Sequence, residues 1–454
     1  MDCTMLVAQQ RSYFARGNTL KLKNRKVVLE RLQQALIANE EAILQALATD
    51  LSKGSTEGYM TEIGIVRSEL RHALKRMSTW SKVRRVKTPL THWPSKSFIV
   101  PEPYGVTLIM APWNYPFQLC MVPLIGAICA GNTAIVKPSA YASATSQVVA
   151  DLIAEVFEIG HVAVVQGGRK ENEQLLEQRF DYIFFTGSVA VGKLVMEKAA
   201  RHLTPVTLEL GGKSPVIVDS TADIPHAARR IIFGKLINAG QTCIAPDYVL
   251  VDAKVKEPLL TALKTEIERA LPKEDLSDFP TIINAKHFRR LAAFVKENPA
   301  ISSETLDEKN LRIPPILLEN ATFVDPVMQE EIFGPILPII TYHTLDEVIK
   351  EITSRPKPLS LYVFTKDKSV MKQFIHTISF GGGCINDTII HMVNSQMGFG
   401  GVSTSGMGSY HGKHSFDTFT HYKSMVKSSN LIDLPLRYRP YSLRKERIIK
   451  RFLR

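Results

Sequence analysis

Apolar and polar positions along this chain are arranged in blocks that predict first helices and then alternating strands and helices. From Leu6 to about Leu51, apolar residues recur every three or four positions with charged residues between them, and residues 57–80 continue this helical pattern. A Pro-rich, basic and non-periodic stretch follows at 82–103, which is either a linker or an extended arm. Beyond it, short apolar runs predict strands at 105–110, 133–136, 161–165 and 182–185, with helices at 117–130, 144–157 and 189–202. This alternation predicts an α/β fold with a doubly wound parallel sheet.

The strand and helix pattern restarts after Pro205. Two strand-like runs, VTLEL and PVIVD, are followed by a predicted helix at 224–239 and a strand at 248–252, which indicates a second α/β domain. The Gly- and Ser-rich segment 381–412 is expected to form loops. A chain of 454 residues, 45% of them hydrophobic, is too long for one ordinary core, so two or three domains are expected.

One uncharged stretch, Tyr104 to Val136, has the length of a membrane span. Prolines and glycines such as Pro112, Pro123 and Gly131 divide it into strand, turn, helix and strand, so a buried core is the better interpretation. The N-terminus has no apolar run and no small-residue cleavage site typical of a secretory signal. The five scattered cysteines lack disulfide-framework or zinc spacing, so we expect no metal site and a cytoplasmic location.

The formal net charge of +12 is concentrated at the C-terminal end. Residues 437–454 carry a net charge of +7, which leaves +5 on the rest of the chain, and basic and aromatic residues are not interleaved elsewhere. We therefore expect no nucleic-acid partner. The tail also holds apolar residues among its Arg and Lys, including Leu443, Ile448 and Ile449. It is expected either to pack on a partner subunit, which we favour, or to make weak contact with an anionic membrane.

Three short segments place reactive residue types beside strand or helix ends. Asn114 follows the strand at 105–110, Glu209 ends VTLEL before two glycines, and Cys243 follows the helix at 224–239 within NAGQTC. Taken singly, such residues are usually a turn asparagine, a solvated glutamate and a small buried thiol. Together they are the groups that covalent aldehyde oxidation requires.

Each of these groups has a distinct task in that chemistry. A hydride does not leave an aldehyde carbon while the carbon is trigonal, so a thiolate such as that of Cys243 must first form a tetrahedral thiohemiacetal. The oxyanion needs fixed donors, and the Asn114 amide and the Cys243 backbone N–H would supply two. Loss of hydride leaves a thioester, and a carboxylate such as Glu209 is the natural base for the water that hydrolyses it.

The segment FFTGSVAVGK, residues 184–193, predicts a phosphate seat where a strand ends and a helix begins. It is not the GxGxxG pattern of most dinucleotide-binding folds. It nearly matches a P-loop, but Leu194 stands where the Mg²⁺-binding hydroxyl belongs, which argues against a nucleotide triphosphatase.

The chain resembles an aldehyde dehydrogenase along nearly its whole length. The segments that carry the resemblance are APWNYPF, GNTAIVKPS, FFTGS, LELGGKSP, AGQTC, EIFGP and FGGVSTSGMGSYHGKHSFDTFTH. The resemblance implies that Cys243 is the nucleophile, Glu209 the base and Asn114 the oxyanion donor. For the cofactor, NAD or NADP, it implies contacts from Trp113, Lys137, Gly187, Ser188, Glu331 and Phe333. It also places Tyr115 either at the substrate tunnel or in the core.

The resemblance also implies a domain organisation. It indicates a fold of two doubly wound α/β domains plus a small β oligomerisation arm, with a cofactor-binding domain (1–80 and 105–208), a catalytic domain (209–412), an arm (81–104 and 413–432) and a basic C-terminal tail (433–454). The short N-terminus and YHGKHSFDTF resemble the class 3 branch, which implies a homodimer acting on medium- or long-chain aliphatic or aromatic aldehydes.

One residue departs from the family pattern, and two other functions remain to be distinguished. Many NAD-preferring relatives have Glu three positions after the lysine of KPS, where this chain has Ala140, so the choice between NAD and NADP is open. An acylating enzyme that uses coenzyme A is one alternative, although Glu209 argues against it. A catalytically silent relative is the other, and the presence of Cys243, Glu209 and Asn114 argues against that.

Overall fold

The first sheet is a six-stranded layer covered by helices on both faces. The computed structural model describes residues 2–296 and 306–453. Five strands are parallel, and a short sixth strand pairs antiparallel at one edge. In spatial order the strands are β14 (Gly406–Met407), β7 (Val206–Glu209), β6 (Tyr182–Thr186), β3 (Val106–Met110), β4 (Thr133–Lys137) and β5 (Val162–Val164). Side chains of β3 and β4 alternate between the cores on the two faces, as a strand with two buried faces requires.

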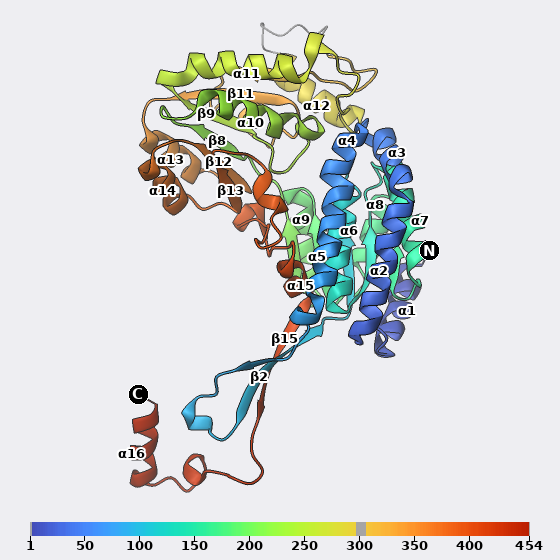
Figure 1. Ribbon diagram of the computed structural model, residues 1–454, viewed down its shortest axis with the longest axis vertical. Coiled ribbons are helices and arrows are strands. Elements are labelled where there is room, and N and C mark those ends of the chain that lie inside the picture. Colours follow the sequence, from blue (N-terminus) through green and yellow to red (C-terminus); the bar gives the residue numbers. More distant parts are fainter. Residues whose placement is uncertain (1, 297–305, 454) are drawn as a thin grey trace.

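Two groups of helices cover the faces of this sheet (Figure 1). One face is covered by α2 (Leu22–Ala38), α3 (Glu40–Leu51), α5 (Gly64–Trp80), α6 (Gln118–Ala130) and α7 (Ser143–Val156). The other face is covered by α1 (Cys3–Ala15), α8 (Arg169–Leu176) and α9 (Val189–Ala200). Between α3 and α5 lie the short α4 (Ser55–Gly58) and a π-helical turn, Tyr59–Ile63.

The uncharged stretch around residues 104–136 forms a strand, a buried helix and a second strand. Every residue of α6 is buried, which explains why the helix carries no charged residue. The helix ends at Gly131, whose φ of 101° is left-handed, and the Arg25 guanidinium packs where a side chain would project. Within residues 2–296 and 306–453, no helix combines the length and apolar character that crossing a membrane requires.

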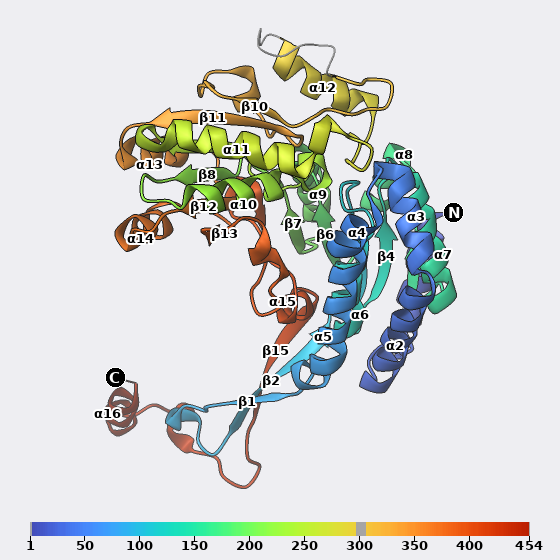
Figure 2. The same ribbon diagram turned by 45° about the horizontal axis from the view of Figure 1, so that its top comes forward.

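The second sheet has six parallel strands. Their spatial order is β10 (Ile316–Leu318), β11 (Ile336–Tyr342), β9 (Tyr248–Asp252), β8 (Pro215–Val218), β12 (Ser360–Phe364) and β13 (Gly382–Ile385). One face packs against α10 (Ile224–Leu236) and α11 (Lys256–Ala270), and the other against α12 (Ala285–Lys296), α13 (Leu345–Ser354) and α14 (Lys368–Thr377). Figure 2 shows this layered unit beside the first one.

Two expectations from the sequence pattern are wrong. The run at 206–209 does not begin a second unit, because β7 pairs with β6 as the last parallel strand of the first sheet. The second sheet begins at β8. The segment 381–412 is not only loop, because β13 pairs with β12 and β14 pairs with β7. An apolar run marks a strand but carries no information about which sheet it joins.

A three-stranded antiparallel sheet extends away from both layers as a long arm (Figures 1 and 2). It consists of β1 (Arg84–Val86), β2 (Lys96–Pro103) and β15 (Thr420–Lys427), and the short α15 (Lys413–Thr418) joins β15 to the body. The last helix, α16 (Leu443–Phe452), lies beyond the arm. Arg454, which belongs to the predicted tail, is outside the described residues.

Candidate active site

A cavity of about 510 Å³ brings together eight of the nine predicted site residues. Its walls come from the ends of β3, β6 and β7, from the loop after α10 and from the loop before β11. The predicted residues that line it are Trp113, Asn114, Gly187, Ser188, Glu209, Cys243, Glu331 and Phe333. The first-sheet contributions follow from the topology, because parallel strands end at the same edge of a sheet.

Cys243 is held by a turn of unusual backbone conformation. Asn238, Ala239 and Gly240 have φ values of 52°, 51° and 73°, a left-handed run that costs energy at the two residues with side chains. At Gly240, a Cβ would lie 2.4 Å from the carbonyl oxygen of Gly334, so only glycine fits there. Burial and the carboxylates of Glu331 and Glu209 raise the pKa of the Cys243 thiol, whereas the N–H groups of Cys243 and Ile244 oppose this shift.

Asn114 is buried beside this turn. Its side-chain amide donates a hydrogen bond to the carbonyl oxygen of Gln241, 3.0 Å away, and therefore points toward the Cys243 segment. The backbone carbonyl oxygen of Asn114 accepts hydrogen bonds from Lys53 Nζ at 2.9 Å and from Asn238 Nδ2 at 2.8 Å. The nucleophile and the amide are thus joined through a shared network.

The network continues into an ion pair that the sequence did not reveal. Lys53 Nζ lies 2.7 Å from Glu62 Oε1, and both side chains are fully buried. Glu62 Oε2 accepts the N–H groups of Phe117 and Gln118 at the start of α6. The pair therefore fixes the loop that carries Asn114. No periodicity or motif signals it, because its partners meet only after folding.

Glu209 stands at the end of β7 with its carboxyl group in the cavity. The side chain is 2% exposed, and neither oxygen has a hydrogen-bond partner among the described residues. Burial raises its pKa well above the ordinary value for a glutamate. Such an unpartnered buried carboxyl is costly for stability and is typical of a functional group.

The part of the cavity around Gly187 and Ser188 has the features of a nucleotide site. Gly187 follows β6, and Ser188 caps the N-terminus of the twelve-residue α9 by accepting a hydrogen bond from the Val191 N–H. A helix N-terminus of this kind favours a phosphate group. Trp113 packs edge-on to Phe333, with ring centroids 5.3 Å apart.

Three cavity residues on or beside α12 were missed by the sequence analysis. They are Lys286, His287 and Arg290. Lys286 and Arg290 bring positive charge to the same cavity as Ser188, and the His287 ring lies obliquely to Trp113, with ring centroids 5.2 Å apart. Their only sequence signal is one helix face with a strong apolar pattern, which marks a packed helix rather than a site.

Glu331 lines the same cavity and is half-buried. Burial and the nearby Asp247 carboxylate raise its pKa to about 8, and its Oε1 is buried without a hydrogen-bond partner among the described residues. Gly211 permits this position, because a Cβ there would lie 2.1 Å from Glu331 Oε2. The unpartnered oxygen, the capped helix and the basic side chains fit a polar, anionic ligand such as NAD or NADP.

Lys137 and Tyr115 lie outside the residues that line the cavity. Lys137 ends β4, and its Nζ donates to the carbonyl oxygens of Pro138 and Gly167. Tyr115 is buried in the core with its hydroxyl 2.5 Å from Thr242 Oγ1 and Lys53 Nζ 4.2 Å from its ring centre. Tyr115 thus contributes to packing beneath the Cys243 turn, which is the core alternative of the two considered.

Comparisons with known proteins identify the family of this chain. The family model described as "Aldehyde dehydrogenase family" matches residues 1–425. The chain belongs to the aldehyde dehydrogenase family. It is 47% identical over 448 residues, 98% of this chain and 97% of the relative, to 4,4'-diaponeurosporen-aldehyde dehydrogenase of Staphylococcus aureus. It is 44% identical to aldehyde dehydrogenase family 3 member B1 of Homo sapiens, over 97% of this chain and 95% of the relative.

Solved structures give the same result for the fold. A structure described as the substrate-bound state of Staphylococcus aureus AldH superposes with a TM-score of 0.97 at 46% identity and covers 99% of both chains. An NAD-dependent aldehyde dehydrogenase from Sinorhizobium meliloti superposes with a TM-score of 0.86 at 27% identity, over 95% of this chain and 88% of that one. This aldehyde dehydrogenase is therefore an oxidoreductase that converts aldehydes to carboxylic acids with NAD or NADP.

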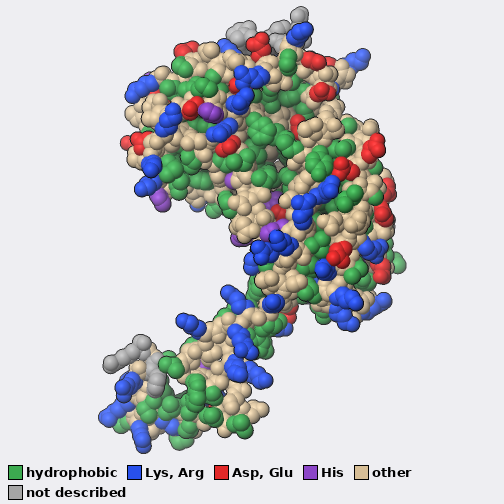
Figure 3. Space-filling view, viewed as in Figure 1, with side chains coloured by type: hydrophobic (Ala, Val, Ile, Leu, Met, Phe, Trp, Pro, Cys, Tyr) green, Lys and Arg blue, Asp and Glu red, His purple; other side chains and the backbone are tan. Residues whose placement is uncertain are grey.

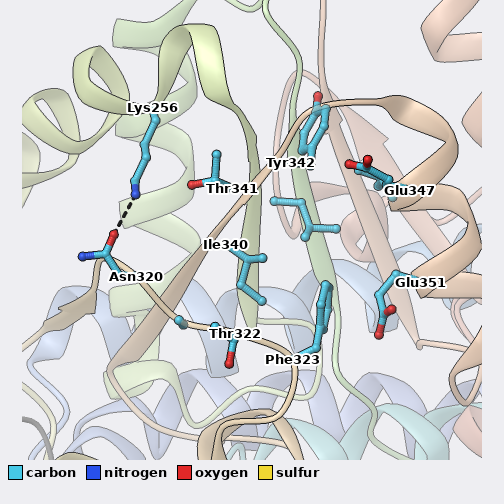
Figure 4. A pocket seen from close by; sticks show the side chains of 12 residues that line it. Lys256, Asn320, Thr322, Phe323, Ile340, Thr341, Tyr342, Glu347 and Glu351 are labelled. Atoms are coloured by element: carbon cyan, nitrogen blue, oxygen red, sulfur yellow. Dashed lines mark hydrogen bonds between the residues drawn. The ribbon is translucent and has the colours of Figure 1, made fainter.

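A second groove, of about 460 Å³, lies at the carboxyl ends of β9 and β11 (Figure 4). Its charged side chains already have partners. Lys256 donates to Asn320, Glu347 caps the start of α13, and Glu351 pairs with Arg355. This groove is therefore explained by packing between helices and strands.

Proposed function

We propose that this enzyme oxidises medium- or long-chain aliphatic or aromatic aldehydes through a covalent intermediate on Cys243. The observation that carries the proposal is the single cavity in which Cys243, Glu209 and Asn114 meet a nucleotide-type wall. Leu119 lines the cavity with Cys243, and Cys243 also packs against the apolar core, which suits an apolar acyl group better than a charged one.

Each catalytic group has a proposed task. Once its proton has been released, the sulfur of Cys243 forms a bond to the aldehyde carbon, and the carbonyl oxygen becomes an oxyanion held by the Asn114 amide and the Cys243 N–H. NAD or NADP supplies the hydride acceptor when it is bound. Glu209 then takes a proton from the water that attacks the thioester, the C–S bond breaks, and the thiol regains its proton as the carboxylic acid leaves.

We propose cofactor contacts within this cavity and, through Lys137, beside it. Gly187 and Ser188 would border the pyrophosphate, Trp113 would line the pocket, and Glu331 would bind the nicotinamide ribose with Phe333 near the ring. Lys137, at the end of β4, would hold the adenosine ribose. The unpartnered Oε1 of Glu331 and the cap of α9 support this orientation.

An assay of aldehydes of graded chain length and aromaticity, with each cofactor, tests the proposal through absorbance at 340 nm. We expect NADH or NADPH formation that increases with the apolar surface of the aldehyde. Dependence on added coenzyme A would instead support the acylating alternative. A wild-type enzyme silent with every aldehyde would support a non-catalytic role.

Cofactor choice gives a separate prediction. We expect NADP to be used with a kcat/KM comparable to or better than that of NAD, because Ala140 supplies no carboxylate to repel the 2′-phosphate. The exposed Arg169 and Lys170 also follow the Gly167–Gly168 turn that binds Lys137. Two unit charges about 4 Å apart near a surface interact by roughly 4 kcal/mol, and a third of that is about tenfold in relative affinity. Ala140→Glu should shift the NADP/NAD ratio toward NAD by about that factor.

Steady-state kinetics with both cofactors measure this ratio, and Ala140→Gln is the control, since it adds bulk without charge. A strong wild-type preference for NAD that Ala140→Glu leaves unchanged would contradict the prediction.

We propose that the chain is a cytoplasmic homodimer built through the arm, with a cofactor-binding domain (1–80 and 105–208) and a catalytic domain (209–412) that both contribute residues to the site. The support is that β15 forms one edge of the arm sheet and exposes apolar side chains such as Met425 and Val426. An exposed strand edge of this kind is usually covered by another chain. Figure 3 shows apolar groups gathered at the arm and tail with Lys and Arg around them.

The basic tail (433–454) is expected to strengthen this dimer. Leu443 is 75% exposed on the isolated α16, so packing on the partner subunit would bury it. Truncation after Leu436 should raise the dimer dissociation constant, measured by size-exclusion chromatography with light scattering. Sedimentation with anionic vesicles provides the contrast, because stronger pelleting of the full chain with an unchanged dimer would support weak membrane contact instead.

A further inference from the structure

The segment that joins the two sheets also contacts Glu331. Directly after Glu209, the chain passes through Gly211 and Gly212 to Lys213. The Gly212 N–H opposes the rise in the pKa of the Glu331 carboxyl, and the missing side chain at Gly211 lets that carboxylate lie against the backbone. The proposed base and the proposed ribose ligand are thus placed by one short segment.

Lys213 holds the loop that precedes and includes Glu331. Its Nζ donates to Asp247 Oδ2 at 2.5 Å and to the carbonyl oxygens of Val327 at 3.0 Å and Glu330 at 2.8 Å. An ammonium group has three donors, so all of them are used. Lys213 therefore fixes the backbone on the N-terminal side of Glu331.

Asp247 holds the other side of the same residue. Its Oδ1 accepts the backbone N–H of Ile332 at 2.9 Å, while its Oδ2 accepts from Lys213. The side chains are only 16% exposed for Lys213 and 5% for Asp247, so solvent screens the pair weakly. The Lys213–Asp247 ion pair thus forms hydrogen bonds with the backbone immediately before and immediately after Glu331.

The thiol and the amide are held by different groups. Lys53, Glu62 and Asn238 support the Asn114 loop and the Cys243 turn, whereas Lys213 lines a neighbouring chamber of about 290 Å³ on the far side of Glu331. Lys213 and Asp247 are absent from the residues that line the Cys243 cavity. A change in this pair should therefore affect Glu331 without moving the backbone that holds the nucleophile.

We propose that Lys213 and Asp247 are positioning residues that set cofactor affinity by fixing Glu331. The inference rests on the proposed role of Glu331 in binding the nicotinamide ribose. Without Lys213, Asp247 is left as a buried carboxylate beside Glu331, and the loop loses three hydrogen bonds from one side chain. The ribose contact then becomes imprecise, and affinity for the cofactor falls.

The test is the binding of NADH to the full chain without aldehyde, measured by fluorescence titration. Lys213→Met should raise the Kd by about tenfold or more, the effect expected when hydrogen bonds to charged groups are lost. The rate of Cys243 alkylation by iodoacetamide without cofactor should not fall, because separate residues hold the thiol and a displaced Glu331 carboxylate would raise the pKa of the thiol less. Lys213→Arg, which keeps the charge and donors, should restore much of the affinity. Lys357→Met changes an exposed lysine of the same chamber and is the matched control.

Three outcomes would overturn the proposal. One is NADH binding to Lys213→Met within twofold of wild type. Another is an equal loss of NADH binding and of thiol reactivity in both Lys213→Met and Lys213→Arg, which would indicate general structural support. If Lys213→Met does not fold, Asp247→Asn takes its place in the comparison. Unchanged NADH binding by Asp247→Asn is the third outcome that would overturn the proposal. Failure of the proposed function would give a different result from failure of this proposal. The wild-type enzyme would then bind NADH but oxidise no aldehyde.

Discussion

Replacing Cys243 by alanine is expected to abolish aldehyde oxidation while leaving NADH binding intact. Without sulfur, the aldehyde carbon stays trigonal and cannot release hydride, so kcat should fall by on the order of 10⁴-fold or more, as for other covalent nucleophiles. Alanine fits the site, since only the sulfur atom is removed. Absorbance at 340 nm measures the loss, and fluorescence titration measures cofactor binding.

Cys384 supplies a matched control for this experiment. It is another half-buried thiol, with its Sγ 3.5 Å from His391 Nδ1, and burial raises its pKa to about 11. Cys384→Ala should retain oxidation at close to the wild-type rate, because this residue does not line the Cys243 cavity. Substantial oxidation by Cys243→Ala would remove Cys243 from its proposed role.

Glu209→Gln is expected to separate the two chemical steps. Glutamine keeps the shape of the side chain but accepts no proton, so hydride transfer should give a pre-steady-state burst of NADH and thioester hydrolysis should slow by about 10²–10⁴-fold. The geometry favours this role, because the Glu209 carboxyl is buried without a partner among the described residues and its pKa is raised by burial. A carboxyl with a raised pKa is a stronger base once it is ionised.

Stopped-flow absorbance compares the burst with the steady state. Glu330→Gln is the control, since Glu330 is exposed at the rim of the same cavity and should leave both phases unchanged. If the burst and the steady state fall together in Glu209→Gln, Glu209 activates the thiol rather than the water.

The sequence by itself determined the local features of the site. Apolar runs bounded by Gly and Pro marked the strands that become β3, β6 and β7, and strands in a parallel sheet carry their ligand-binding loops at one edge. Asn114 and Ser188 therefore share a cavity for a reason that is visible in their order along the chain, whereas the place of Glu209 beside them depends on which sheet its strand joins. Short-range signals of this kind need no knowledge of distant residues.

Only the tertiary structure decided which distant side chains support these residues and which strands join each sheet. Lys53 with Glu62, and Lys213 with Asp247, are buried ion pairs formed between elements that no periodicity relates. The strand at 206–209 fits either sheet by its pattern, and its pairing with β6 follows from how the whole layer packs. Local propensity specifies that a strand forms, but long-range burial of charge and apolar surface selects its partners.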